Sequence, residues 1–276
     1  MIQDIHPDRL ENTYAPRAPK NGDAMMLFSG EGKTAVRIRE GRIFFPTEED
    51  AGREDAVYLF SISGRGYYLA SGQKETLPSG FEYRSLRELR ETCTGKEMFA
   101  AFTAYHLWRW YADNRRCGRC GGENAIHEKE RALRCRVCGH TVWPRINPAV
   151  IVGVIRGDCL LITRYRTGYG HNALVAGFTE IGETLEETVG REVMEETGIR
   201  VRNIRYYRSQ PWGIAQDLLA GFWCEAEEPG EIRMDPGELK YAEWVRREDI
   251  VLQPDNLSLT NEMMKRFKEN GADSVF

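Results

Sequence analysis

The sequence predicts a mixed α+β and α/β protein built from three parts, and three observations support this division. Short apolar runs separated by turns fill residues 24–70, and a helical pattern follows, which predicts an N-terminal α+β domain over residues 1–114. Two CxxC pairs predict a metal-binding ribbon over residues 115–142. Further strands then flank an amphipathic, glutamate-rich helix, which predicts a separate C-terminal domain over residues 143–276.

Composition limits the classes of function. The chain has 276 residues, of which 41% are hydrophobic and 29% charged, so it is long enough for more than one globular domain. Its net charge of −4 indicates no overall nucleic-acid-binding surface. We find no 18-residue apolar run and no apolar signal core at the N-terminus, so the expected location is cytoplasmic.

In the first domain, residues 1 to about 23 are polar and contain three prolines, so we expect a loose leader. A GKT sequence inside residues 30–34 suggests a phosphate-binding loop, but Leu27 stands where that motif needs its first glycine. We therefore expect a hairpin turn there. Residues 85–112 predict one or two helices with an aromatic stripe that belongs to the core or a subunit interface.

The ribbon carries four of the seven cysteines, with fourteen residues between its two CxxC pairs. Four thiolates give Zn²⁺ a closed tetrahedral site without room for water, so we expect a structural zinc. The predicted ligands are Cys117, Cys120, Cys135 and Cys138. The other cysteines are expected to be buried free thiols: Cys93, Cys159 and Cys224.

The same segment is rich in arginine, which leaves nucleic-acid binding open as a second role for the ribbon. Its arginines are Arg115, Arg116, Arg119, Arg131, Arg134 and Arg136.

The glutamate-rich helix has clear local signals at its two ends. Thr184 is a good N-cap, and Glu187 completes a capping box three residues later. Gly198 fits the left-handed position that ends a helix. Between them, Leu185, Val189 and Val193 recur every four residues and form a stripe that can pack on a core.

Glu192, Glu195 and Glu196 fall on one edge of this helix, close to its negative end. Like charges at this spacing repel one another, so the cluster is unfavourable for stability alone. A solvated acidic face is one explanation. A hard divalent cation with oxygen ligands, Mg²⁺ or Mn²⁺, is the other, and we expect Glu192 and Glu196 to be its ligands.

A longer pattern surrounds these glutamates and has the form G-x5-E-x7-R-E-U-x-E-E-x-G-U, where U is a bulky aliphatic residue. Its nine fixed positions are filled by Gly177, Glu183, Arg191, Glu192, Val193, Glu195, Glu196, Gly198 and Ile199. The pattern resembles the signature of the Nudix hydrolases. This resemblance implies an α/β/α sandwich that hydrolyses a diphosphate linked to another group, usually in a nucleotide.

Two further features resemble the NAD(H) diphosphatase branch of that family, namely the zinc ribbon before the domain and the SQPW sequence at residues 209–212. The branch motif continues as PFPxS, whereas residues 213–217 read GIAQD here. The implied reaction is metal-dependent cleavage of NAD(H) into AMP and nicotinamide mononucleotide, with NAD-capped RNA as a related substrate. Because of the departure, ADP-ribose or dinucleoside polyphosphates remain alternatives. A non-catalytic nucleotide sensor that binds nucleic acid is a third.

The resemblance also implies roles for particular residues. The Ala176 carbonyl and Glu238 would join the metal ligands, Glu195 would be a third ligand or the base, and Arg191 would pair with Glu183 or a helix glutamate. Trp143 and Phe178 would stack on rings of the substrate. The other implied substrate contacts are Gln210, Pro211, Trp212, Gly213, Ile214, Ala215, Gln216, Asp217, Thr260 and Glu130. The aromatic stripe and the family together suggest a homodimer.

Overall fold

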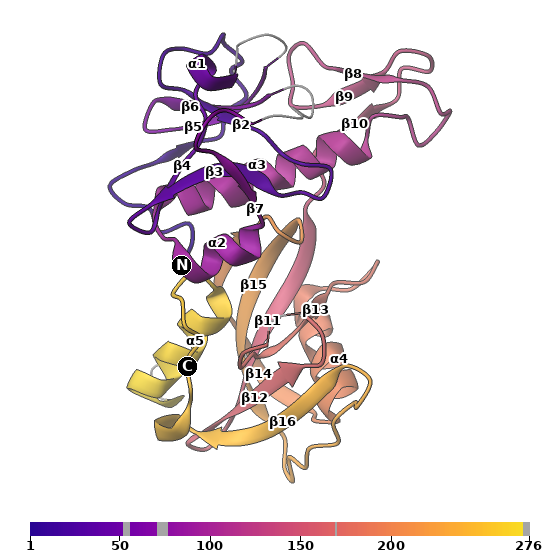
Figure 1. Ribbon diagram of the computed structural model, residues 1–276. Helices are drawn as coiled ribbons and strands as arrows, with labels where there is room; N and C mark the ends of the chain where they lie inside the picture. Colours follow the sequence, from indigo (N-terminus) through magenta and orange to yellow (C-terminus); the bar gives the residue numbers. More distant parts are fainter. Residues whose placement is uncertain (52–55, 71–76, 169, 273–276) are drawn as a thin grey trace. The chain divides into compact units, whose positions relative to one another are not determined.

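The computed structural model describes residues 1–51, 56–70, 77–168 and 170–272 (Figure 1). The chain forms two compact units. The N-terminal unit comprises Ile2–Ile146 and Trp212–Gln216, and the C-terminal unit comprises Asn147–Pro211 and Asp217–Phe276 together with Met1. No helix within the described ranges is long and apolar enough to cross a membrane.

The N-terminal unit contains two small sheets besides the ribbon. One has the order β1 (Leu10–Glu11), β5 (Val57–Ile62), β6 (Arg65–Leu69), β2 (Ala24–Met26). The other has the order β4 (Arg42–Phe44), β3 (Thr34–Arg39), β7 (Glu82–Arg84). The helices are α1 (Glu48–Ala51), α2 (Leu86–Thr92) and α3 (Lys96–Asp113). These elements confirm the predicted mixture of strands and helices.

The aromatic stripe lies on α3 and contributes to the core of this unit. Phe99 and Phe102 are buried, and the Trp108 ring stacks on Phe28 with 5.1 Å between centroids. The expectation of a loose leader is wrong. Strand β1 pairs with β5, and the guanidinium of Arg17 lies 2.7 Å from the carboxylate of the buried Asp23, so specific contacts fix this segment.

The C-terminal unit is built on a six-stranded mixed sheet. Its strands are β11 (Asn147–Arg156), β12 (Cys159–Tyr165), β13 (Val175–Phe178), β14 (Val201–Trp212), β15 (Asp217–Ala226) and β16 (Leu239–Arg246). The order is β14-β15-β11-β12-β16, and β13 pairs with β11. Strand β11 is central because it runs parallel to β15 and antiparallel to both β12 and β13. A short 3₁₀ helix, η1 (Arg247–Asp249), follows β16.

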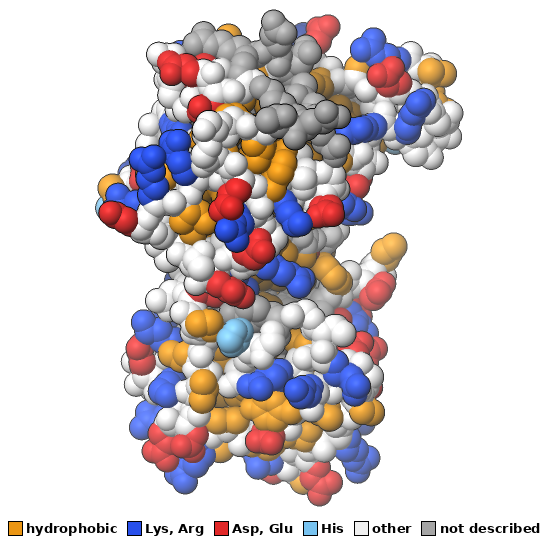
Figure 2. Space-filling view, in the orientation of Figure 1, with side chains coloured by type: hydrophobic (Ala, Val, Ile, Leu, Met, Phe, Trp, Pro, Cys, Tyr) orange, Lys and Arg blue, Asp and Glu red, His pale blue; other side chains and the backbone are white. Residues whose placement is uncertain are grey.

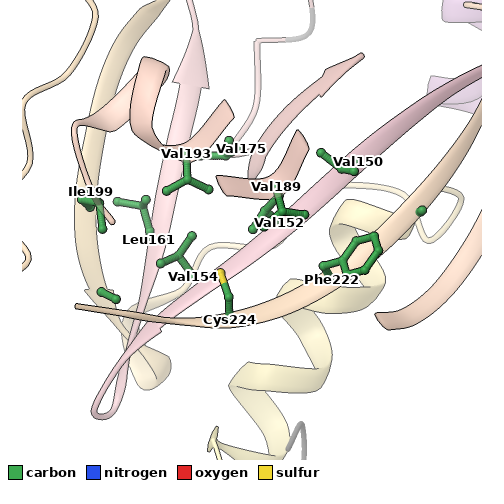
Figure 3. Packing of buried hydrophobic residues seen from close by; sticks show 12 residues of the cluster. Val150, Val152, Val154, Leu161, Val175, Val189, Val193, Ile199, Phe222 and Cys224 are labelled. Carbon is green, nitrogen blue, oxygen red and sulfur yellow. The ribbon is translucent and has the colours of Figure 1, made fainter. Parts of the chain in front are cut away.

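Helices α4 (Leu185–Thr197) and α5 (Leu259–Asn270) cover opposite faces of this sheet (Figure 1). Side chains alternate between the faces along β15. Phe222 and Cys224 pack in one cluster with Val189 and Val193 of α4 (Figure 3). The Trp223 ring lies on the other face, 6.4 Å from that of Phe267 in α5. The unit is therefore the expected α/β/α sandwich.

The ends of α4 follow the sequence signals. Thr184 accepts a hydrogen bond from the backbone N–H of Glu187, and the Glu187 carboxylate accepts one from the backbone N–H of Thr184. Gly198 has φ 70°, the left-handed conformation that favours glycine. Helix α4 is thus defined by its own sequence as well as by packing.

Charged residues of both signs are mixed across the face shown in Figure 2. Among the three thiols outside the ribbon, Cys93 and Cys224 are buried, as expected. Cys159 is only half-buried, so that expectation is wrong for this residue. It is the first residue of β12 and pairs with Arg156 beside the hairpin turn, where the core cannot cover it fully.

Two glycines give a matched test of this packing. A Cβ atom at Gly153 would lie 2.3 Å from the Trp223 ring, whereas one at Gly190 in α4 would meet nothing within 4 Å. We expect Gly153→Ala to lower the free energy of unfolding by about 1–3 kcal/mol through overpacking. Gly190→Ala should raise it by about 0.5–1 kcal/mol because alanine favours a helix. Urea unfolding of both variants checks this, and a neutral Gly153→Ala would contradict the packing described.

Candidate active site

Helix α4 meets strand β13 at a position without a side chain. A Cβ atom at Gly177 would lie only 1.9 Å from Cδ of Glu192, so any other residue would displace the carboxylate. Only 12% of the Glu192 side chain is exposed. The glycine of the motif is therefore required because a glutamate of the same motif lies against the strand backbone.

The guanidinium of Arg191 is the centre of the charged array. It donates to both carboxylate oxygens of Glu183 at 2.6 and 2.9 Å, to Glu192 at 2.7 Å and to Glu195 at 3.0 Å. It also donates to the backbone carbonyl of Phe178 at 2.9 Å. The hydrogen bonds from Arg191 lower the pKa of Glu183 to about 2. One cation thus offsets part of the repulsion among three carboxylates and links α4 to β13.

Glu196 faces inward, and only 2% of the residue is exposed. Burial raises its pKa to about 8, and repulsion from Glu192 and Glu238 adds to that effect. Burial also raises the pKa of Glu192. The two inner glutamates therefore lie where their charged forms are disfavoured unless a cation is nearby.

Tyr165, which the sequence reading missed, connects two of the predicted metal ligands. Its hydroxyl lies 3.0 Å from one carboxylate oxygen of Glu196 and 3.3 Å from the carbonyl oxygen of Ala176. It accepts a hydrogen bond from the backbone N–H of Ala176 at 3.0 Å. The strand period gave a usable signal, because Tyr165 shares its face of β12 with Leu161, which packs in the cluster under α4.

Hard oxygen ligands therefore converge on one side of α4. The Tyr165 hydroxyl joins Glu196 to the Ala176 carbonyl. Glu192 and Glu238 are close enough to Glu196 to act on it electrostatically, and Glu238 also acts on Glu192. Oxygen donors of this kind suit a divalent cation. Glu195 differs from the inner pair because 60% of its side chain is exposed.

The four cysteines of the ribbon form a compact cluster that can hold a metal ion. Their sulfur atoms all lie within 4.8 Å of one another, and in the part of the chain that the structure describes no other group of three metal-ligating side chains is as close. The Sγ–Sγ distance is 3.8 Å from Cys117 to Cys138 and 3.5 Å from Cys120 to Cys135. A tetrahedral Zn²⁺ site with Zn–S bonds of about 2.3 Å requires sulfurs about 3.8 Å apart.

The cluster is held by the ribbon sheet, with the order β10 (Thr141–Val142), β9 (Leu133–Cys135), β8 (Asn124–Ile126). Backbone N–H groups of Val137 and Cys138 donate to Sγ of Cys135 at 3.4 and 3.5 Å. Such bonds favour the thiolate form, which is the form that binds metal.

Two of the predicted substrate contacts meet in the N-terminal unit. The indole N–H of Trp143 donates to the Glu130 carboxylate at 2.9 Å, and Trp143 is 58% exposed. In the C-terminal unit, Phe178 is 53% exposed directly after the motif glycine. Both aromatic rings are therefore open to a ligand.

The segment after the SQPW sequence packs in the N-terminal unit. The Trp212 ring lies 5.0 Å from Phe102 of α3, and the Arg90 guanidinium lies 5.2 Å from its centroid. A Cβ atom at Gly213 would lie 2.0 Å from the carbonyl oxygen of Phe102. This arrangement leaves no room for a proline at residue 213. It therefore explains why glycine stands there in place of the first proline of the branch motif PFPxS.

Gln216 is buried in the same segment and accepts a hydrogen bond from the Arg145 guanidinium at 2.8 Å. The Arg145 carbonyl in turn lies 2.7 Å from Nε2 of His106. Ile214 is half-buried, and Pro211 and Ala215 are exposed. Arg145 and His106 thus fix the segment, although no local sequence signal marks them.

Gln210, in contrast, belongs to the C-terminal unit and is fully buried. Its amide donates to the Leu257 carbonyl at 2.8 Å and accepts from the Leu259 N–H at 2.7 Å. Those contacts anchor the first turn of α5, where Thr260 is half-buried.

Comparison with known proteins agrees with this geometry. Residues 145–267 match the model of the NUDIX domain. Over 151 residues the chain is 44% identical to proteins named NAD-capped RNA hydrolase NudC from Escherichia coli O1:K1 / APEC and from E. coli strain SMS-3-5. Those matches cover 54% of this chain, and the chain spans only 58% of the length of these relatives.

Among solved structures, the crystal structure of a NUDIX hydrolase from Nitrosomonas europaea aligns with a TM-score of 0.50 at 22% identity. The alignment covers 56% of this chain and 90% of that one. At this identity the likeness supports the fold.

Asp217, at the start of β15, is a buried carboxylate whose loss of hydration is not fully replaced by hydrogen bonds. It is 6% exposed, and its Oδ1 atom has no hydrogen-bond partner among the described residues. Burial raises its pKa from 3.8 to about 6, and a hydrogen bond with Asn147 only partly opposes that shift. The carboxyl group therefore favours the folded state when protonated, below about pH 4, and loses that contribution as the pH rises through 6.

We expect Asp217→Asn to remove this dependence. At pH 7.5 the variant should have a free energy of unfolding roughly 1–3 kcal/mol above that of the wild type, and the gain should vanish near pH 4. Urea unfolding of the metal-free proteins across this pH range measures the difference. The exposed Asp249→Asn variant is the control and should follow the wild type. An equal gain at pH 4 and pH 7.5 would contradict the raised pKa.

Proposed function

We propose that the chain hydrolyses the diphosphate bond of NAD(H) to AMP and nicotinamide mononucleotide, and the match of residues 145–267 to the NUDIX domain model supports this reaction class. The observation that carries the proposal is the array of three glutamates held by Arg191 against the bare backbone of Gly177. The names of the E. coli relatives support a nicotinamide dinucleotide as the substrate and extend it to NAD-capped RNA ends.

Glu192, Glu196, Glu238 and the Ala176 carbonyl would hold the catalytic Mg²⁺ or Mn²⁺. The raised pKa of the buried Glu196 supports this assignment, because a neighbouring divalent cation would stabilise its carboxylate. A bound cation would neutralise diphosphate oxygens and lower the pKa of water. The four cysteines would hold a structural Zn²⁺, which their sulfur distances fit.

In the reaction, the oxygen of one water molecule forms a bond to one phosphorus, and the bond from that phosphorus to the bridging oxygen breaks. The other phosphate leaves with the electron pair. We assign Glu195 as the acceptor of the water proton because it is the most exposed carboxylate in the array. Arg191 would keep Glu192 and Glu195 oriented, and Glu183 would keep Arg191 in place.

For the substrate rings, Phe178 and Trp143 are the proposed stacking surfaces because both are more than half exposed. A second candidate function, hydrolysis of ADP-ribose or dinucleoside polyphosphates, is favoured by one observation. Residues 213–215 offer no aromatic ring that could support a nicotinamide. The complete set of glutamates argues against a non-catalytic sensor. The three-domain division, a homodimer and a cytoplasmic location remain predictions.

A product screen tests the reaction. NADH, NAD, ADP-ribose, diadenosine polyphosphates and NAD-capped RNA would be incubated with Mg²⁺ or Mn²⁺ and analysed for mononucleotides by chromatography. We expect NADH or NAD to be cleaved, and Glu195→Gln to lower kcat by about 10²–10⁴-fold. Glu186→Gln, an exposed change on the first turn of α4, should leave kcat unaltered. The enzyme proposal fails if no mononucleotide forms, and the role of Glu195 fails if Glu195→Gln turns over normally.

Tyr165→Phe tests the arrangement of the metal ligands. Removing the hydroxyl leaves Glu196 and the Ala176 carbonyl without the group that joins them, and loss of such supporting bonds weakens metal binding by about 10–100-fold. Mn²⁺ titration followed by electron paramagnetic resonance measures the affinity directly. Tyr207→Phe is the control because its hydroxyl also lies near a glutamate, Glu262, at 3.3 Å. Equal Mn²⁺ affinities for both variants would refute the role of Tyr165.

A further inference from the structure

The ribbon carries a set of basic side chains that the proposed reaction does not use. Between residues 115 and 142 there are seven basic and three acidic residues, although the whole chain has a net charge of −4. Six of the seven are exposed, and none forms an ion pair with a described carboxylate. They are Arg115, Arg116, Arg119, Lys129, Arg134 and Arg136.

The seventh basic residue, Arg131, has structural contacts among the described residues that the other six lack. Arg131 is half-buried, donates to the Asn12 carbonyl at 3.0 Å and lies 5.6 Å from the centroid of the Tyr14 ring. The other six have no comparable contact within the described residues. Exposed like charges on a small sheet repel one another. The stability of the ribbon therefore does not explain why six basic side chains lie on its surface.

Three of these cations line a groove on the ribbon, together with exposed apolar side chains. The groove, which we call the ribbon groove, is bordered by Ile126, His127, Lys129, Arg134, Arg136 and Val137, and one carboxylate, Glu128, also lines it. Val137 is 75% exposed and Ile126 is 46% exposed. In Figure 2, Lys and Arg side chains stand beside apolar and acidic ones over strands β8–β10, which Figure 1 labels.

This composition fits a single-stranded nucleic acid. Arginine and lysine suit phosphates, while the exposed aliphatic side chains offer apolar contact to bases. Residues 115–142 contain no Phe, Tyr or Trp, so base stacking on aromatic rings, a source of strong base contacts, is absent from this segment. Binding should therefore depend on phosphate contacts, be sensitive to salt and show little sequence preference.

We propose that the ribbon groove binds the RNA chain that follows the cap of an NAD-capped RNA. The inference rests on the proposed function, because it assigns a second contact region to the same substrate. Free NAD lacks this RNA chain, so the groove should affect capped RNA and leave the free dinucleotide unaffected.

The test uses the full chain with Arg134→Gln and Arg136→Gln combined. The control combines Arg39→Gln and Arg42→Gln, which removes the same charge from exposed positions in the same unit, away from the ribbon. Zinc content is measured in both, since Arg134 and Arg136 flank Cys135. The readouts are fluorescence anisotropy with an uncapped 20-nucleotide RNA, and steady-state kinetics with free NAD and with the same RNA bearing an NAD cap.

Loss of two phosphate contacts should lower the slope of log affinity against log salt by about 1.4 for a single strand. Over the decade from 1 M to 0.1 M salt, this corresponds to about 25-fold weaker RNA binding at 0.1 M. The KM for capped RNA should rise by a similar factor, while the KM and kcat for free NAD stay unchanged. The control should match the wild type in every readout.

Unchanged RNA affinity, or an equal change in the control, overturns the proposal. Displacement of the RNA by polyglutamate at equal charge concentration also overturns it, because the groove would then serve acidic polymers in general. If the wild type cleaves no dinucleotide, the proposed function fails by itself. In that case the anisotropy measurement alone decides whether the groove binds RNA.

Discussion

The contact between Arg191 and its three glutamates is the interaction on which the candidate site depends. Helix α4 ends with acidic residues at the negative end of its dipole, where they repel both the dipole and one another. The guanidinium joins Glu183, Glu192 and Glu195 in one network and also reaches the backbone of β13 through Phe178. The fold serves this network, because the centre of the sheet presents β13 to α4 at a glycine.

Features that depend on neighbours in the sequence were predicted correctly. The capping box at Thr184 and the left-handed Gly198 define both ends of α4 because each signal spans only a few residues. The cysteine cluster was predicted for a similar reason, since two CxxC turns each bring a pair of thiols together. The apolar stripe correctly predicted which face of α4 is buried, because Val189 and Val193 lie in the core.

Features that depend on distant contacts were missed. Tyr165 meets Glu196 across 31 positions of sequence. The strand period could place Tyr165 on the face of β12 that lies under α4, but no local pattern reports its contact with Glu196. The SQPW sequence appeared to be one pocket element, yet Gln210 anchors α5 while Trp212 packs on Phe102 of α3. The leader appeared loose from its composition, but the ion pair of Arg17 with buried Asp23 fixes it. In each case tertiary packing determined the role of a residue whose neighbours were uninformative.

The departure at residues 213–215 follows from that packing. The carbonyl oxygen of Phe102 lies where any side chain at residue 213 would begin, so glycine is required and proline is excluded. The segment lies close to α3, and residues 213–215 contain no aromatic ring. For the proposed substrate, ring support then depends on Phe178 and Trp143, whose rings are exposed. The Arg191 network would determine which bond is cleaved. Aromatic residues outside that network would determine which substrate rings are preferred.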